Sequence, residues 1–98
     1  MNIFTINIEN DDGKYVLQCV YEYVNGNYQC EVRDRDDLII KKVSESSSKK
    51  CYKEIAAFLS TVGNIVSVTS SDEHSVDTFI LRTYLRIGRS NIILSKNL

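Results

Sequence analysis

The side chains that could perform chemistry are sparse, and their spacing does not assemble a catalytic group. His74 is the only histidine, and it lies in the polar stretch 72–75, which we expect to be a surface loop. A serine or cysteine nucleophile activated by histidine would have to use this one residue. Asp72, Glu73 and His74 are adjacent, and adjacent loop residues seldom converge on one metal ion without further ligands. The sequence therefore predicts a protein that is not an enzyme and that uses neither a metal ion nor another cofactor.

A strip of arginine and tyrosine near the C-terminus could bind anions. If the segment 76–87 is a strand, Arg82, Tyr84 and Arg86 project from one face of it, with Arg89 just beyond. Guanidinium groups interleaved with an aromatic ring suit phosphates, carboxylates or stacked bases. The alternative is a solvated outer face.

A second candidate for anion binding lies at the start of a predicted helix. Ser48, Lys49, Lys50 and Lys53 bring a hydroxyl and ammonium groups to this end. The exposed backbone N–H groups of a helix N-terminus attract anions. The alternative here is ordinary capping with solvated lysines.

Acidic residues gather in a turn predicted after Arg33. We expect Asp34, Asp36 and Asp37 to contact a basic groove on a partner. Asp34-x-Asp36 matches the opening of a calcium loop, but the required glycine and closing glutamate are missing. The net charge is −5 over the first forty residues and +4 over the remainder. Such asymmetry can steer a partner or favour self-association.

Two dipeptides typical of hairpin turns fix the pairing of the first strands. Asp12-Gly13 and Asn25-Gly26 each lie between runs of alternating apolar and polar residues, and such pairs favour type I′ turns. The first turn, if centred on Asp12-Gly13, places Ile8 opposite Leu17, Ile6 opposite Cys19 and Phe4 opposite Tyr21. The second places Tyr23 opposite Tyr28, Tyr21 opposite Cys30 and Cys19 opposite Val32.

Both turns give the same apolar face, because side chains alternate between the two faces of a strand. The opposite face is polar except for a few aliphatic side chains, namely Ile3, Val16, Val20 and Val24. Aliphatic side chains grouped on a solvent-facing side of a sheet indicate that another part of a protein covers them. The cover is either a second protomer in a homodimer or the C-terminal hairpin of the same chain.

The three cysteines do not have the spacing of metal ligands. Cys19 and Cys30 share the predicted buried face as diagonal neighbours, which is a poor starting geometry for a disulfide. Cys51 has no obvious partner. We therefore expect buried free thiols.

The length and composition suit one domain, residues 1–98. No stretch approaches the roughly 20 apolar residues of a membrane span, and the N-terminus lacks a basic region followed by an apolar one. We expect a cytoplasmic protein without a membrane partner. The abundance of Ile, Asn, Lys and Ser, with no Pro or Trp, is typical of AT-rich genomes such as those of phages and mobile elements.

The remainder of the chain predicts strands at 38–43 and 65–69 and a helix at about 48–62 that ends before Gly63. The segment 76–87 fits either a strand or a helix, and its alternation favours a strand in a hairpin. The expected fold is α+β, an antiparallel meander of five to seven strands with one amphipathic helix on one face.

These features favour a small protein-interaction module, such as an inhibitor or immunity-like protein of phage or mobile-element type, that blocks a partner protein through its charged surface. The alternative is a nucleic-acid-binding protein that uses the arginine strip and the lysines of the helix start. A sequence pI of about 5.8 argues against it, because phosphate neutralisation needs clustered positive charge.

Overall fold

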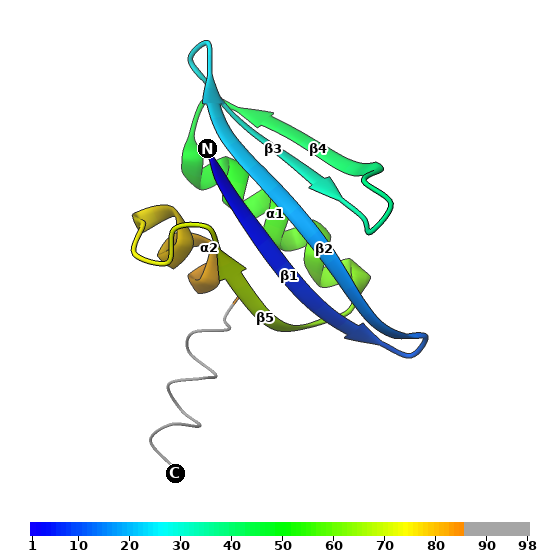
Figure 1. Ribbon diagram of the computed structural model, residues 1–98. Helices are drawn as coiled ribbons and strands as arrows, with labels where there is room; N and C mark the ends of the chain where they lie inside the picture. The colour runs from blue at the N-terminus through cyan, green and yellow to red at the C-terminus, as the bar shows by residue number, and fades with distance from the viewer. Residues whose placement is uncertain (86–98) are drawn as a thin grey trace.

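The computed structural model describes residues 1–85, which form one antiparallel sheet with two helices on one of its faces (Figure 1). The α+β class and the meander are thus confirmed, with five strands and a second helix. The elements are β1 (Asn2–Asn10), β2 (Gly13–Val24), β3 (Asn27–Arg33), β4 (Ile39–Glu45), α1 (Ser48–Val62), β5 (Asn64–Ser70) and α2 (Val76–Leu85).

The β2–β3 hairpin has the predicted register, with Tyr23 opposite Tyr28 and Cys19 opposite Val32. Asn25 and Gly26 both have positive φ, as a type I′ turn demands.

The predicted centre of the first hairpin is wrong by one residue. Asp11 and Asp12 form the turn, Asn10 pairs with Gly13, and Ile6 therefore pairs with Leu17 instead of Cys19. The Asn10 side chain fixes this turn, because its Oδ1 accepts a hydrogen bond from Asp12 N at 2.8 Å. Pairing moves by two residues, an even number, so every side chain keeps its predicted face.

The strand order is β4-β3-β2-β1-β5. The last strand therefore pairs with the first, which places β1 inside the sheet and makes β4 and β5 the two edges. A bulge near Asn7 leaves Val66 without a partner on β1. Val66 is 54% exposed.

The helix α1 packs across β3 and β4 and buries Cys51, Tyr52, Ile55 and Leu59 against the apolar face of the sheet. Its N-cap is Ser47, whose Oγ accepts from Lys50 N at 3.5 Å. Gly63 follows the last turn against β1, where a Cβ would lie 2.7 Å from the Glu9 carbonyl oxygen. The chain thus needs a glycine here for the close approach of two backbones.

The segment 76–85 is a helix, so the predicted C-terminal strand is wrong. Ser75 begins it: Ser75 Oγ accepts from Thr78 N at 3.1 Å, and Asp77 lies in the first turn. The alternation of apolar residues misled the prediction because Phe79 is 71% exposed and lies outside the packed core, whereas Leu81 is buried. Leu81 anchors α2 beside α1.

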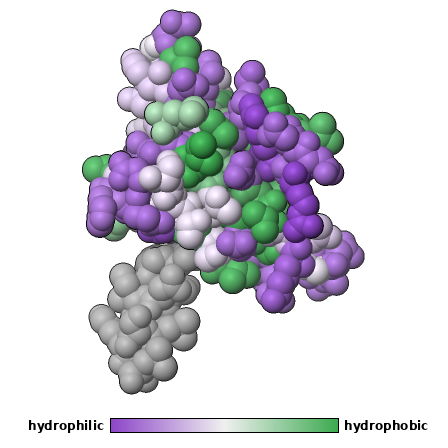
Figure 2. All heavy atoms as spheres, in the orientation of Figure 1, coloured by the Kyte–Doolittle hydropathy of each residue, from purple (hydrophilic) through white to green (hydrophobic). Residues whose placement is uncertain are grey.

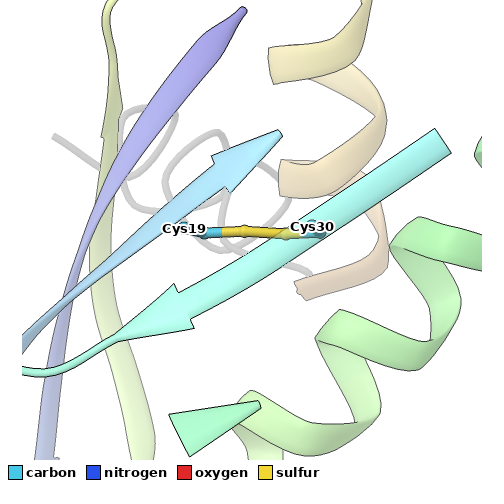
Figure 3. Close-up of a disulfide and its surroundings, with 2 residues drawn as sticks. All are labelled: Cys19 and Cys30. Atoms are coloured by element: carbon cyan, nitrogen blue, oxygen red, sulfur yellow. A yellow bond between two sulfur atoms is a disulfide. The ribbon is translucent and has the colours of Figure 1, made fainter. Parts of the chain in front are cut away.

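Cys19 and Cys30 form a disulfide on the buried face of the sheet (Figure 3). The expectation of free thiols therefore fails for this pair and holds for Cys51, which is buried and free. The two cysteines are diagonal neighbours, as predicted, since Cys19 lies opposite Val32. Their Cα atoms are 6.4 Å apart, which is within the range that a disulfide spans.

Stacked aromatic rings fill part of the core between the sheet and α1. The rings of Tyr21 and Tyr52 are 4.8 Å apart, and Tyr52 meets Phe4 edge to face at 6.5 Å. Burial raises the pKa of Tyr21 to about 12 and raises that of Tyr52 as well. Both hydroxyls are therefore held in their neutral form.

Within residues 1–85, neither helix has the length and apolar character needed to cross a membrane.

Candidate protein-binding notch beside β2

The first half of β2 extends beyond the end of β3. β2 has 12 residues and β3 has 7, and β3 pairs only with the part from Gln18 to Val24. Residues Gly13 to Leu17 therefore pair with β1 on one side and have no strand on the other (Figure 1).

The backbone groups that point away from β1 in this stretch belong to Lys14 and Val16. Residues flanking a two-residue hairpin turn bond to each other, and bonding alternates along a strand. Val24 flanks the turn and bonds to Asn27, so the even-numbered residues of β2 direct their N–H and C=O groups toward the β3 side. At Lys14 and Val16 no strand of the described chain receives these groups.

The turn between β3 and β4 forms the opposite wall. Asp34 organises it: one Oδ1 accepts hydrogen bonds from Asp36 N at 2.9 Å and Leu38 N at 3.0 Å. Asp37 has a φ of 65° and accepts from Arg33 at 3.1 Å. Glu31 and Asp37 together raise the pKa of Arg33. The turn is thus rigid, and it leaves the side chains of Arg35 and Asp36 exposed.

Between β2 and this turn lies a hollow of about 320 Å³, which we call the notch. Its lining combines half-exposed apolar side chains with charges of both signs: Lys14, Tyr15, Val16, Leu17, Asp34, Arg35 and Asp36. Tyr15 is 40% exposed and Val16 38%. A second hollow of about 370 Å³ shares Val16 and Arg35 and continues over the sheet to Val66 on β5.

The mixed character of this side of the molecule is visible in Figure 2, where apolar and polar groups are interspersed over the strands. The orientation is that of Figure 1, with the strands in front of α1. The two helices cover the other face. The predicted cover by a C-terminal hairpin is therefore wrong for residues 76–85, which form a helix on the far side.

The predicted acidic residues do not act as one group. Asp34 is used within the turn, Asp37 pairs with Arg33, and Asp36 is the acid free to contact a partner at the notch. Sequence reasoning found this turn but missed Lys14, Tyr15 and Arg35. The unequal lengths of the predicted strands β2 and β3 were the available signal.

The predicted arginine strip does not exist as a strand face. Arg82 lies on α2, where its Nε donates to the Val68 carbonyl at 3.2 Å and its Nη2 pairs with Glu73 at 2.6 Å. Tyr84 packs half-buried against the core. Arg86 and Arg89 lie outside the described residues.

The candidate residues at the start of α1 lie in its first two turns. Ser47 is the cap, Ser48 is the first residue of the helix, and Lys49 and Lys50 are exposed. Lys53 lines a separate hollow of about 390 Å³ between α1 and α2. Lys53 lies one helical turn after Lys49 and Lys50, so the three lysines share one face at the start of α1, and anion binding there stays a prediction.

Residues 1–85 contain no cluster of three or more side chains suited to holding a metal ion. Comparison with family models, curated proteins and solved structures found no match.

Proposed function

We propose that this protein is a non-enzymatic binding module that takes an extended segment of a partner protein into the notch and thereby blocks that partner. The observation that carries the proposal is the unpaired edge of β2 at Lys14 and Val16, which lies beside exposed apolar and charged side chains. Addition of a strand to a free sheet edge is a common way to recognise peptides, since backbone bonds give affinity and the flanking side chains give specificity.

The composition of the notch supports a protein partner. Tyr15 and Val16 offer half-exposed apolar area from the two faces of β2, and Arg35, Lys14 and Asp36 add charges of both signs. Tyrosine and arginine are the residue types that contribute most at protein interfaces.

The alternative, nucleic-acid binding through the C-terminal strip, has less support. Arg82 is held by Val68 and Glu73, so its guanidinium is not free for phosphate. Nucleic acid stays an outcome of the test below.

The disulfide bears on where such a module works. Disulfides persist in oxidising compartments and are rare in the cytosol. The Cys19–Cys30 pair therefore favours a compartment other than the cytoplasm that the sequence suggested.

The test is affinity capture from lysate of the source cell and its host, before and after nuclease treatment, with four baits compared. Val16→Pro removes the N–H that faces the notch, and Arg35→Glu reverses the charge on its wall. Lys49→Glu is the matched control on α1, and circular dichroism verifies the fold of each bait. We expect one discrete protein that the wild type and Lys49→Glu retain and that both notch variants lose. Equal retention by all baits, or recovery of nucleic acid alone before nuclease treatment, would contradict the proposal.

A further inference from the structure

The two edges of the sheet differ in whether side chains bond to their outward-pointing backbone groups. On β5, Glu73 Oε1 accepts from Ser70 N at 2.8 Å, and Arg82 donates to the Val68 carbonyl at 3.2 Å. Glu73 and Arg82 pair with each other at 2.6 Å, and the Ser70 N–H together with Arg82 lowers the pKa of Glu73. This pair of side chains occupies the positions that an added strand would need, which is how proteins protect an edge.

The edge at β4 has no such protection among the described residues. The alternation established for β2 continues through β3, so Val43 bonds to Cys30 and the N–H and C=O groups of Lys42 and Ser44 point outward. No hydrogen bond within residues 1–85 reaches these outward groups. The first two residues of the strand, Ile39 (50%) and Ile40 (41%), and Leu38 (62%) before them are exposed apolar residues.

We propose that β4 pairs antiparallel with β4 of a second copy, so that two five-stranded sheets join into one continuous sheet. The outward residues pair with each other, with Lys42 of one copy opposite Ser44 of the other. The symmetry of the dimer then places Val43 opposite Val43 at the two-fold axis.

Charge selects this register. Lys41 and Glu45 both lie on the helix side of β4. The Lys41 Nζ is 5.9 Å from the centre of the Phe58 ring on α1, and the charge of Glu45 contributes to raising the pKa of Cys51 on the same helix. In the proposed register Lys41 of each copy faces Glu45 of the other, which gives two opposite-charge pairs. Opposite charges across two strands stabilise their pairing, and like charges destabilise it.

Two neighbouring symmetric registers also pair outward residues, and both are disfavoured because neither sets Lys41 against Glu45. One places Lys42 opposite Lys42 at the axis, and Lys42 is 63% exposed with only a 3.8 Å contact with Glu31, so its charge is not neutralised within the chain. The other places Ser44 opposite Ser44 and sets the Glu45 carboxylate against Val43, which leaves the charge unpaired.

The helices fit the same arrangement. α1 packs over both β3 and β4, and strands in a sheet are about 4.8 Å apart. Two copies of α1 related by the axis would therefore lie roughly 10 Å apart, which is the upper end of ordinary helix packing. The proposed dimer leaves room for the helices and brings their sides into contact.

Sedimentation velocity of the full chain across a concentration series tests the proposal. We expect the wild type to dimerise. Ser44→Pro should abolish the dimer without unfolding the monomer, because proline is tolerated where the N–H of an edge strand points outward. Ser44→Ala keeps that N–H and should dimerise like the wild type.

A charge exchange then checks the register. Lys41→Glu alone and Glu45→Lys alone should each weaken dimerisation roughly tenfold or more, since each variant creates two like-charge pairs. The double variant Lys41→Glu/Glu45→Lys should restore it. A wild type that stays monomeric, a Ser44→Pro variant that dimerises fully, or a double variant no better than the single ones would overturn the proposal.

Discussion

Reduction of the Cys19–Cys30 disulfide should lower the stability of the fold by about 3 kcal/mol. The two cysteines are 11 residues apart, and a loop of this length costs the unfolded chain about that much when it is closed. The change is a large part of the 5–15 kcal/mol expected for a small domain.

The assay is equilibrium unfolding in urea, followed by circular dichroism, with and without a phosphine reductant. Burial of the sulfur atoms does not prevent the measurement, because the reductant acts on the unfolded chains and the equilibrium follows. With a urea dependence of about 1.5 kcal/mol per M, the midpoint should fall by roughly 2 M. Cys51→Ala is the matched control, since it removes the free thiol and keeps the pair.

An intact mass that shows no loss of two hydrogens under non-reducing conditions would refute the disulfide directly. An unchanged urea midpoint in the presence of reductant would refute the reasoning about its contribution. The first result alone would restore the expectation of free thiols.

Two further predictions concern the core. Gly63→Ala should destabilise the domain by about 1–3 kcal/mol in the same urea assay, because the new Cβ would lie 2.7 Å from the Glu9 carbonyl oxygen; a midpoint equal to that of the wild type would contradict the close approach. Stability should fall as the pH rises above about 9, since burial raises the pKa of Cys51 to about 11 and that of Tyr21 to about 12, so the unfolded chain loses these protons first. Unfolding followed by tyrosinate absorbance at 295 nm checks this, and ionisation of all tyrosines near their ordinary pKa in the folded state would count against it.

The strands with strong turn signals could be predicted from the sequence, and the second helix could not. Asn25-Gly26 determines one register because few residues accept positive φ at both turn positions. Asp12-Gly13 gave the correct faces but not the correct turn, because the Asn10 side chain competes for the backbone of Asp12. Ser75 was a readable helix cap, but the alternation that follows it looked like a strand.

The binding residues were harder to predict than the strands. The acidic turn was identified, yet the roles of Asp34 and Asp37 depend on which backbone and side-chain groups the turn brings near them. The notch itself arises from the unequal lengths of β2 and β3. That difference brings Tyr15 and Arg35, which are far apart in the sequence, to the same hollow, and its signal lies in the lengths of two strands instead of in any local motif.

The position of β1 inside the sheet has a consequence for synthesis of the chain. β1, β2, β3 and β4 can associate as soon as they leave the ribosome, but the second side of β1 waits for β5, whose residue Thr69 pairs with Thr5. Until then the nascent chain carries a first strand with one unpaired edge, and such edges promote aggregation during folding. Completion of β5 closes that edge of β1, and the later arrival of Glu73 and Arg82 then closes the edge of β5 itself. The C-terminal part of the chain therefore determines when the N-terminal part no longer has a free strand edge that could pair with another chain.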